Sequence, residues 1–163
     1  MSKGAPFAIV LAAAALAWAA SSRAAQLGCT AAVTKYGGAT ARVFCGSATA
    51  TVHAGGKTFT IRQGSCDRGP KYLSINIGEV VLGTSTKPKP EYFGLNIGKL
   101  PFIGGAPASR DGTYHSGVVA LDHAGKGYAL RAQATVKLAN GRTRGTFSAT
   151  QLTGGVLTGS FKC

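Results

Sequence analysis

The 163-residue chain has few of the side chains from which most catalytic and metal sites are built. It contains only 5 Asp and Glu, 3 His and 4 Cys, and it has no Gly-x-Ser-x-Gly, His-Glu-x-x-His or Cys-x-x-Cys motif. Three of the acids, Asp67, Asp111 and Asp122, lie in turn sequences, where carboxylates usually accept hydrogen bonds from nearby backbone. These absences favour a binding protein over an enzyme, with no metal and no cofactor.

A secreted hydrolase is the enzymatic alternative, with His115 or His123 acting as a base beside Ser116. Such a base must be held against both a nucleophile and an orienting group, and the sequence contains no motif that assembles the three. We therefore expect no catalytic residues.

Amphipathic helical periodicity is also lacking, and the one long apolar run lies at the N-terminus. Lys3 precedes an apolar stretch over residues 7–20, and Ser22 and Ala24 supply small residues at the −3 and −1 positions of a cleavage site. This pattern predicts a secretory signal peptide over residues 1–24, because the stretch is short and Ala-rich for a membrane span. Residues 25–163 are then expected to form a single secreted domain without a transmembrane segment.

Positive charge, by contrast, is abundant. The chain has 18 Lys and Arg, and its formal net charge is +13. Loss of residues 1–24 would remove Lys3 and Arg23 and leave a net charge of +11. It would also remove the only Trp and the only Met of the chain. A surface with this charge attracts polyanions.

Four cysteines in an exported chain predict two disulfides, because oxidation is permitted outside the cytoplasm. Spacing alone leaves three pairings open. We favour a local bridge between Cys29 and Cys45, which flank one short segment, and this leaves Cys66 to pair with Cys163. A zinc site is the rival, but no His lies near a pair of cysteines.

Short runs rich in Thr, Val, Ile, Phe and Tyr, separated by glycines, predict strands joined by turns. Period-two alternation is longest over 128–138, which we expect to be one strand, and it continues over 146–150 and 157–162. Further strands are expected at 40–44, 48–53, 57–63 and 114–121. The similar segments 73–78 and 93–98 are expected to be equivalent strands that meet one core layer. About ten strands predict an all-β, antiparallel β-sandwich stapled by disulfides, with a partly open β-barrel as the alternative.

Several basic residues share the polar side of the C-terminal strands. By parity Arg131 and Lys137 point to this side, neighbouring strands add Arg144 and Lys162, and Arg142 lies at the turn. We expect these five residues to form a strip that contacts an anionic cell-wall polymer or another polyanion. Sequence-specific nucleic-acid recognition is not expected, since no recognition motif is present and no aromatic residues interleave with these charges.

The C-terminal two thirds also resembles the mycobacterial LpqH-type lipoprotein antigens. The shared features are Cys66 at mid-chain, the strand-like segment 73–78, and a last strand that ends in Phe161-Lys162-Cys163. The resemblance implies a Gly-rich exported β domain, a Cys66–Cys163 bridge and the role of a surface antigen or carrier of small apolar ligands. It implies no catalytic residues.

The chain departs from that family at the lipidation site. Gln26 stands three residues before Cys29, where a lipobox requires an aliphatic residue, and we therefore expect a freely secreted protein. An apolar-ligand carrier remains the second hypothesis, with a pocket between the sheets near Phe93, Leu95 and Phe102. The oligomeric state is left open.

Overall fold

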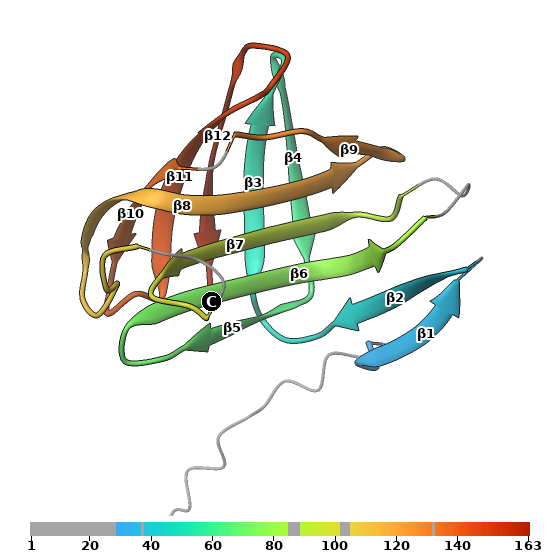
Figure 1. Ribbon diagram of the computed structural model, residues 1–163, viewed down its shortest axis with the longest axis horizontal. Helices are drawn as coiled ribbons and strands as arrows, with labels where there is room; N and C mark the ends of the chain where they lie inside the picture. The colour runs from blue at the N-terminus through green and yellow to red at the C-terminus, as the bar shows by residue number, and fades with distance from the viewer. Residues whose placement is uncertain (1–28, 37, 85–88, 102–104, 132) are drawn as a thin grey trace, which may run out of the picture.

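The structure is a computed structural model that describes residues 29–36, 38–84, 89–101, 105–131 and 133–163. The expected signal peptide over 1–24 lies outside these residues, and so does Phe102, one of the residues expected near an apolar pocket. The described residues form strands joined by turns and loops (Figure 1).

Twelve strands make up the fold. They are β1 (Ala32–Tyr36), β2 (Ala39–Phe44), β3 (Thr49–Ala54), β4 (Lys57–Arg62), β5 (Gly64–Arg68), β6 (Tyr72–Leu82), β7 (Tyr92–Gly98), β8 (Gly112–His123), β9 (Lys126–Tyr128), β10 (Ala134–Ala139), β11 (Arg144–Thr150) and β12 (Val156–Lys162). All the paired strands are antiparallel, and they form one open sheet in the order β1-β2-β6-β7-β8-β10-β11-β12-β3-β4. β5 pairs with β6, and β9 pairs with β8. The expected all-β, antiparallel, disulfide-stapled fold is confirmed.

The sheet folds over so that its two halves face each other across the core. Figure 1 shows β6, β7 and β8 running crosswise to β3, β4, β11 and β12. We call the first group, with β1, β2, β5 and β9, the front half, and β3, β4 and β10–β12 the back half. The arrangement therefore combines the two facing layers of a sandwich with the continuous hydrogen bonding of a partly open barrel.

Two strands carry the chain from one half to the other. In β8, residues 112–117 pair with β10 of the back half, and residues 118–122 pair with β7 of the front half. At the opposite corner β4 turns at Gln63, which has a φ of 66°, into β5. The Gln63 carbonyl accepts a hydrogen bond of 3.0 Å from the Gly78 amide of β6.

The core lies between the halves and is made by alternate residues of each strand. Leu73, Ile75 and Ile77 of β6 are fully buried, as are Phe93, Leu95 and Ile97 of β7. These two sets lie directly opposite each other in the register of β6 and β7, which confirms the expectation that the similar segments are equivalent strands of one core layer. Burial of each such side chain stabilises the fold by about 1.5–3 kcal/mol.

In the back half, glycine and phenylalanine lie opposite each other on the core side of β11 and β12. In the β11–β12 register Gly145 lies opposite Phe161, and Phe147 lies opposite Gly159. A Cβ atom at either glycine would come within 2.6 Å of the opposite phenylalanine ring. Each ring therefore occupies the space that a side chain would need, and the Phe147 ring packs 5.0 Å from that of Phe93 in the front half.

Both expected disulfides are present. Cys29 is bonded to Cys45 across 16 residues, and Cys66 is bonded to Cys163 across 97 residues. The second bridge connects β5 of the front half to the residue that follows β12 of the back half.

The expectation of one strand over 128–138 is wrong. β9 ends at Tyr128, and β10 begins at Ala134 after Gln133, whose φ is 73°. Both strands pair with β8, but Ala134 lies opposite Gly117, two residues later than the β9 ladder would place it. In the segment between the two strands, the Arg131 amide donates to the Thr150 carbonyl at 2.8 Å, and both Arg131 and Gln133 are exposed.

Candidate functional site: the hydroxyl face and the basic row

The outward surface of the back half is covered by hydroxyl groups. We define the hydroxyl face as the outward-facing Thr and Ser residues of β3, β4 and β10–β12, together with Thr113 of β8. Its members, all exposed or partly exposed, are Thr49, Thr51, Thr58, Thr60, Thr113, Thr135, Thr146, Ser148, Thr150, Thr158 and Ser160. They face outward because the alternate residues of the same strands fill the core.

Strand register arranges these residues in rows that cross the strands. One row contains Thr135, Ser148, Thr158, His53 and Thr58 in neighbouring strands. The next row contains Thr113, Lys137, Thr146, Ser160, Thr51 and Thr60. Neighbours in a row are about 4.8 Å apart and the rows are about 6.7 Å apart, as strand spacing and rise require.

A third row, at the end of the hydroxyl face, carries positive charge. Arg144 of β11 lies directly opposite Lys162 of β12, and Thr49 of β3 separates Lys162 from Arg62 of β4. We call Arg144, Lys162 and Arg62 the basic row. Like charges directly opposite each other on adjacent strands destabilise a sheet. The Arg144–Lys162 pair is therefore a feature that packing does not explain.

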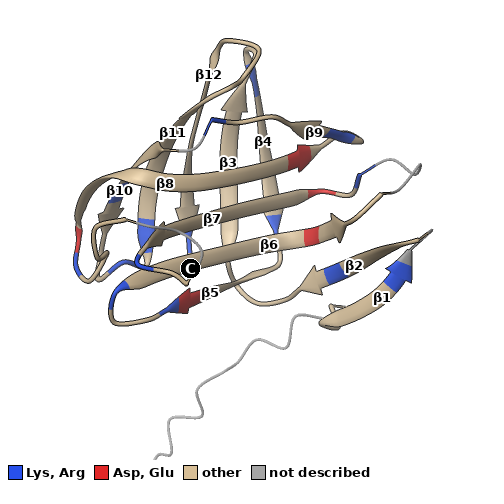
Figure 2. Ribbon diagram, viewed as in Figure 1, with Lys and Arg blue, Asp and Glu red and all other residues tan. Residues whose placement is uncertain are grey.

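None of the five acids of the chain lies within a back-half strand, although Asp111 accepts hydrogen bonds from the Gly141 and Arg142 amides in the β10–β11 turn. The five acids are Asp67, Glu79, Glu91, Asp111 and Asp122, and none falls within β3, β4, β10, β11 or β12. Figure 2 shows them on β5, β6 and β8 and in the segments before β7 and β8. Arg62, on the edge strand β4, also lines a groove with Glu79 and Glu91, whereas Arg144 and Lys162 lie on interior strands.

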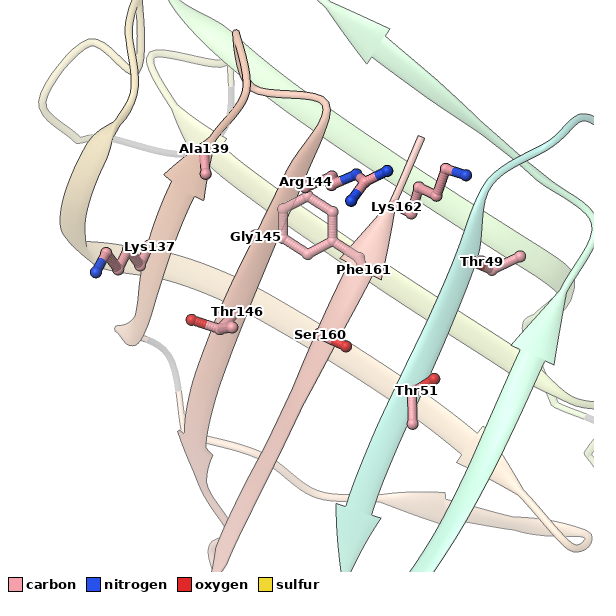
Figure 3. Close-up of a pocket in the computed structure, with 10 residues that line it drawn as sticks. All are labelled: Thr49, Thr51, Lys137, Ala139, Arg144, Gly145, Thr146, Ser160, Phe161 and Lys162. Atoms are coloured by element: carbon pink, nitrogen blue, oxygen red, sulfur yellow. The ribbon is translucent and has the colours of Figure 1, made fainter.

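A shallow hollow of about 700 Å³ joins the basic row to the hydroxyl face (Figure 3). Its walls include Thr49, Thr51, Arg144, Ser160 and Lys162, and it opens widely to solvent. Figure 3 shows the Arg144 and Lys162 side chains extending to the same side of the hollow, while Lys137 extends in the opposite direction.

The structure divides the expected basic strip. Arg144 and Lys162 lie together as expected, and Lys137 is exposed in the neighbouring row. Arg131 is exposed but bonds Thr150, at the end of β11 far from Arg144. Thr150 lies six residues along β11 from Arg144, which corresponds to about 20 Å.

The Arg142 guanidinium contacts backbone carbonyls of the protein itself. One guanidinium nitrogen, Nη1, donates to the carbonyl oxygens of Gly69, Tyr72 and Ala108 at 2.8, 3.1 and 3.0 Å. The Arg142 amide in turn donates to Asp111 at 2.7 Å. This side chain fastens loops of the front half to the β10–β11 turn, and we do not include it in the binding surface.

The outward surface of the front half is organised differently, by hydrogen bonds among its own side chains. The Tyr92 hydroxyl donates to Asn76 Oδ1 at 2.7 Å, Asn76 Nδ2 donates to Ser74 Oγ at 3.3 Å, and the Ser74 hydroxyl donates to Asn96 Oδ1 at 2.7 Å. Burial raises the pKa of Tyr92 to about 12, and the negative charge of Asp122 adds to this shift.

The histidines of the hydrolase hypothesis lie at different places. His115 Nδ1 is 3.2 Å from Thr135 Oγ1, at the margin of the hydroxyl face. His123 stacks on Phe59 with ring centroids 3.5 Å apart, and its Nδ1 contacts Glu91 Oε2. Two different sets of partners thus hold the two imidazoles.

Two of the three residues expected near an apolar pocket lie in the core. Phe93 and Leu95 are completely buried, and the Phe93 ring packs on Phe147. Within the described ranges there is no group of three or more His, Cys, Asp or Glu positioned to hold a metal ion. No helix in the described part of the chain is long and apolar enough to cross a membrane.

Comparison of the chain with protein-family models, with curated proteins and with solved structures found no match. The resemblance to LpqH-type antigens stays a prediction.

Arg62 and the order of the hydroxyl rows escaped the sequence reasoning. Alternation within 57–63 already places Arg62 on the same side as Thr58 and Thr60. The missing information was long-range: β3 pairs with β12, more than 100 residues later in the chain, and only this pairing brings Arg62 into line with Lys162.

Proposed function

We propose that this protein is a secreted, non-catalytic binding protein of a bacterial envelope or extracellular space, and that it contacts anionic polymers through the basic row. The observation that carries the proposal is the Arg144–Lys162 pair, two like charges opposite each other on a surface half that has no acid in its strands. A bound anion would relieve their repulsion by supplying a counter-charge.

The surroundings of the pair support the proposal. Arg144 and Lys162 are exposed, on interior strands whose register is fixed by neighbours on both sides. Their positions are therefore set by the sheet, and a polymer that meets them also meets Arg62 in the same row and Lys137 in the next. Polyanion contacts of this kind weaken as salt rises.

The test compares charge reversals at matched net charge. We expect Arg144→Glu with Lys162→Glu to weaken binding of the oxidised protein to linear polyphosphate and to washed bacterial envelopes about tenfold or more at low salt. The matched control is Lys35→Glu with Lys126→Glu, at exposed positions on β1 and β9 of the front half, and we expect it to weaken binding less than threefold. Binding is measured by co-sedimentation across a salt series.

Two outcomes would contradict the proposal. Equal losses in the two variants would mean that only net charge matters. Binding that does not change with salt would mean that charge is not the basis of the interaction.

A further inference from the structure

We infer that the anionic partner is a polysaccharide bearing carboxylate groups, laid across the strands along the hydroxyl face. This inference rests on the proposed function and specifies its ligand. It is carried by one juxtaposition: rows of exposed hydroxyl groups run parallel to a row of cations on the same rigid surface.

The hydroxyl rows match the chemistry of sugars. A Thr or Ser hydroxyl both donates and accepts hydrogen bonds, and so does each hydroxyl of a sugar ring. Because the row through Thr146 and Ser160 crosses six neighbouring strands, it offers polar partners along about 24 Å of an extended chain.

The face is also organised before any ligand arrives. Thr51 Oγ1 lies 3.2 Å from Thr60 Oγ1, and His53 Nδ1 lies 2.8 Å from Thr58 Oγ1. At the other margin His115 contacts Thr135. Threonine is stiff at χ1, so little side-chain freedom is lost when a ligand binds.

The cations lie where a charged sugar chain would need them. A chain that follows the row through Thr146 and Ser160 has Lys137 within that row and Arg144 and Lys162 about 6.7 Å to one side. The hollow of Figure 3 connects these positions. Carboxylates on one edge of the chain would reach the basic row, while ring hydroxyls meet Thr146, Ser160 and Thr51.

Nucleic acid fits the same face less well. Single-stranded nucleic acids bind through aromatic side chains on which bases stack. The outward-facing described residues of β3, β4 and β10–β12 include no Phe, Tyr or Trp. Neutral glycans, in turn, would leave the Arg144–Lys162 pair without a counter-charge.

The test separates hydroxyl contacts from charge contacts. The hydroxyl variant is Thr60→Val, Thr146→Val and Ser160→Ala, which removes three hydroxyls without changing charge. Its matched control is Thr30→Val, Thr34→Val and Ser109→Ala, at exposed positions outside the hydroxyl face. The charge variant is Arg144→Gln with Lys162→Gln. The probes are polygalacturonate, linear polyphosphate, dextran and double-stranded DNA.

For the unmodified protein we expect polygalacturonate to bind more tightly than polyphosphate or DNA at equal charge concentration, and dextran to bind weakest. The hydroxyl variant should lose about tenfold in affinity for polygalacturonate and less than twofold for polyphosphate, while its control changes neither. The charge variant should lose affinity for both anions.

Other results would contradict either the sugar assignment or the polyanion proposal. If the hydroxyl variant keeps its polygalacturonate affinity while the charge variant loses it, the sugar assignment is wrong and the polyanion proposal survives. If the charge variant binds both anions as before, both are wrong. Tighter binding of DNA or polyphosphate by the unmodified protein also overturns the sugar assignment, and this readout needs no variant. Should the triple variant fail to fold, Thr146→Val alone is compared with Thr34→Val.

Discussion

The two halves of the folded sheet carry different sets of polar and charged side chains. The outward surface of the front half holds its Ser, Asn and Tyr groups in a network of mutual hydrogen bonds, and the front half and its adjoining segments contain all five acids of the chain. The strands of the back half contain no acid and present rows of hydroxyls and cations to solvent. The front-half network includes the buried Tyr92, whereas the hydroxyls and cations of the back half are exposed or partly exposed, even where two of them contact each other.

This contrast supports the proposal that the back half binds the anionic partner. A solvent-exposed sheet face that binds no partner can carry interspersed positive and negative side chains, which limits repulsion between like charges. The front half and its connecting segments do so, with Lys89 3.5 Å from Asp122. The back half instead keeps Arg144 opposite Lys162, which costs stability unless an anion is bound.

Loss of the bridge between the halves should have the largest effect on the molecule. Cys66→Ala with Cys163→Ala opens a cross-link of 97 residues, and Cys29→Ala with Cys45→Ala opens one of 16 residues within the front half. The chain-entropy model predicts losses of about 4.7 and about 3 kcal/mol in the free energy of unfolding. Urea denaturation of the two variants measures the difference, and a larger loss from the shorter bridge would contradict this account.

Alkaline pH should loosen the front half selectively. Tyr92 keeps its proton to a pKa of about 12 in the folded protein, against 10.0 when unfolded. Its stabilising contribution is therefore complete below pH 10 and is lost as pH rises toward 12, a change of about 2–3 kcal/mol.

Tyr92→Phe provides the control for this effect. The variant loses the hydrogen bond to Asn76 and should be less stable at pH 8, but its stability should fall less between pH 10 and 11.5. Denaturant titrations at each pH give the comparison. Parallel decline in the two proteins would show that Tyr92 does not cause the alkaline loss.

Removal of an acid from the front half should have the smallest effect. Burial raises the pKa of Asp122 above its usual 3.8, although the neighbouring Lys89 lowers it in part. The protonated carboxyl thus favours folding below pH 3.8, and this contribution disappears as pH rises through the higher pKa of the folded state.

The side chain in the Asp122→Asn variant cannot ionise, so the variant does not lose stability as pH rises through the pKa of Asp122. Relative to the unmodified protein, the variant should gain stability between pH 3 and pH 7 by less than about 1 kcal/mol. Thermal denaturation of both proteins at pH 3 and at pH 7 tests the sign of this change in stability. A variant that becomes relatively less stable toward pH 7 would mean that the ion pair with Lys89 outweighs burial.

Local patterns predicted most of the fold. Alternation over 146–150 and 157–162 placed most of β11 and β12 and identified which of their residues face outward, because side-chain direction in a strand follows parity. The expected strands 48–53 and 57–63 correspond to β3 and β4, and the glycines between them, Gly55 and Gly56, both have positive φ in the turn. Both disulfides were also predicted correctly.

What failed depended on contacts distant in sequence. β5, with the sequence Gly-Ser-Cys-Asp-Arg, lacks β-branched residues and is a strand because it pairs with β6. The register offset between β9 and β10 and the irregularity between Ala134 and Val136 are defined by pairing with β8, which alternation within 128–138 cannot reveal. Arg142 looked like a surface charge because its three carbonyl partners lie 34 to 73 residues away.

The spacing of the cysteines also sets an order of events during synthesis. Cys29 and Cys45 are close enough in sequence to meet as soon as the first quarter of the chain has emerged, whereas Cys66 must wait for 97 further residues. In an oxidising compartment the early bridge would consume both nearby thiols before Cys163 is made. Cys66 would then be the only thiol left for Cys163, and this timing alone would suppress the two non-native pairings.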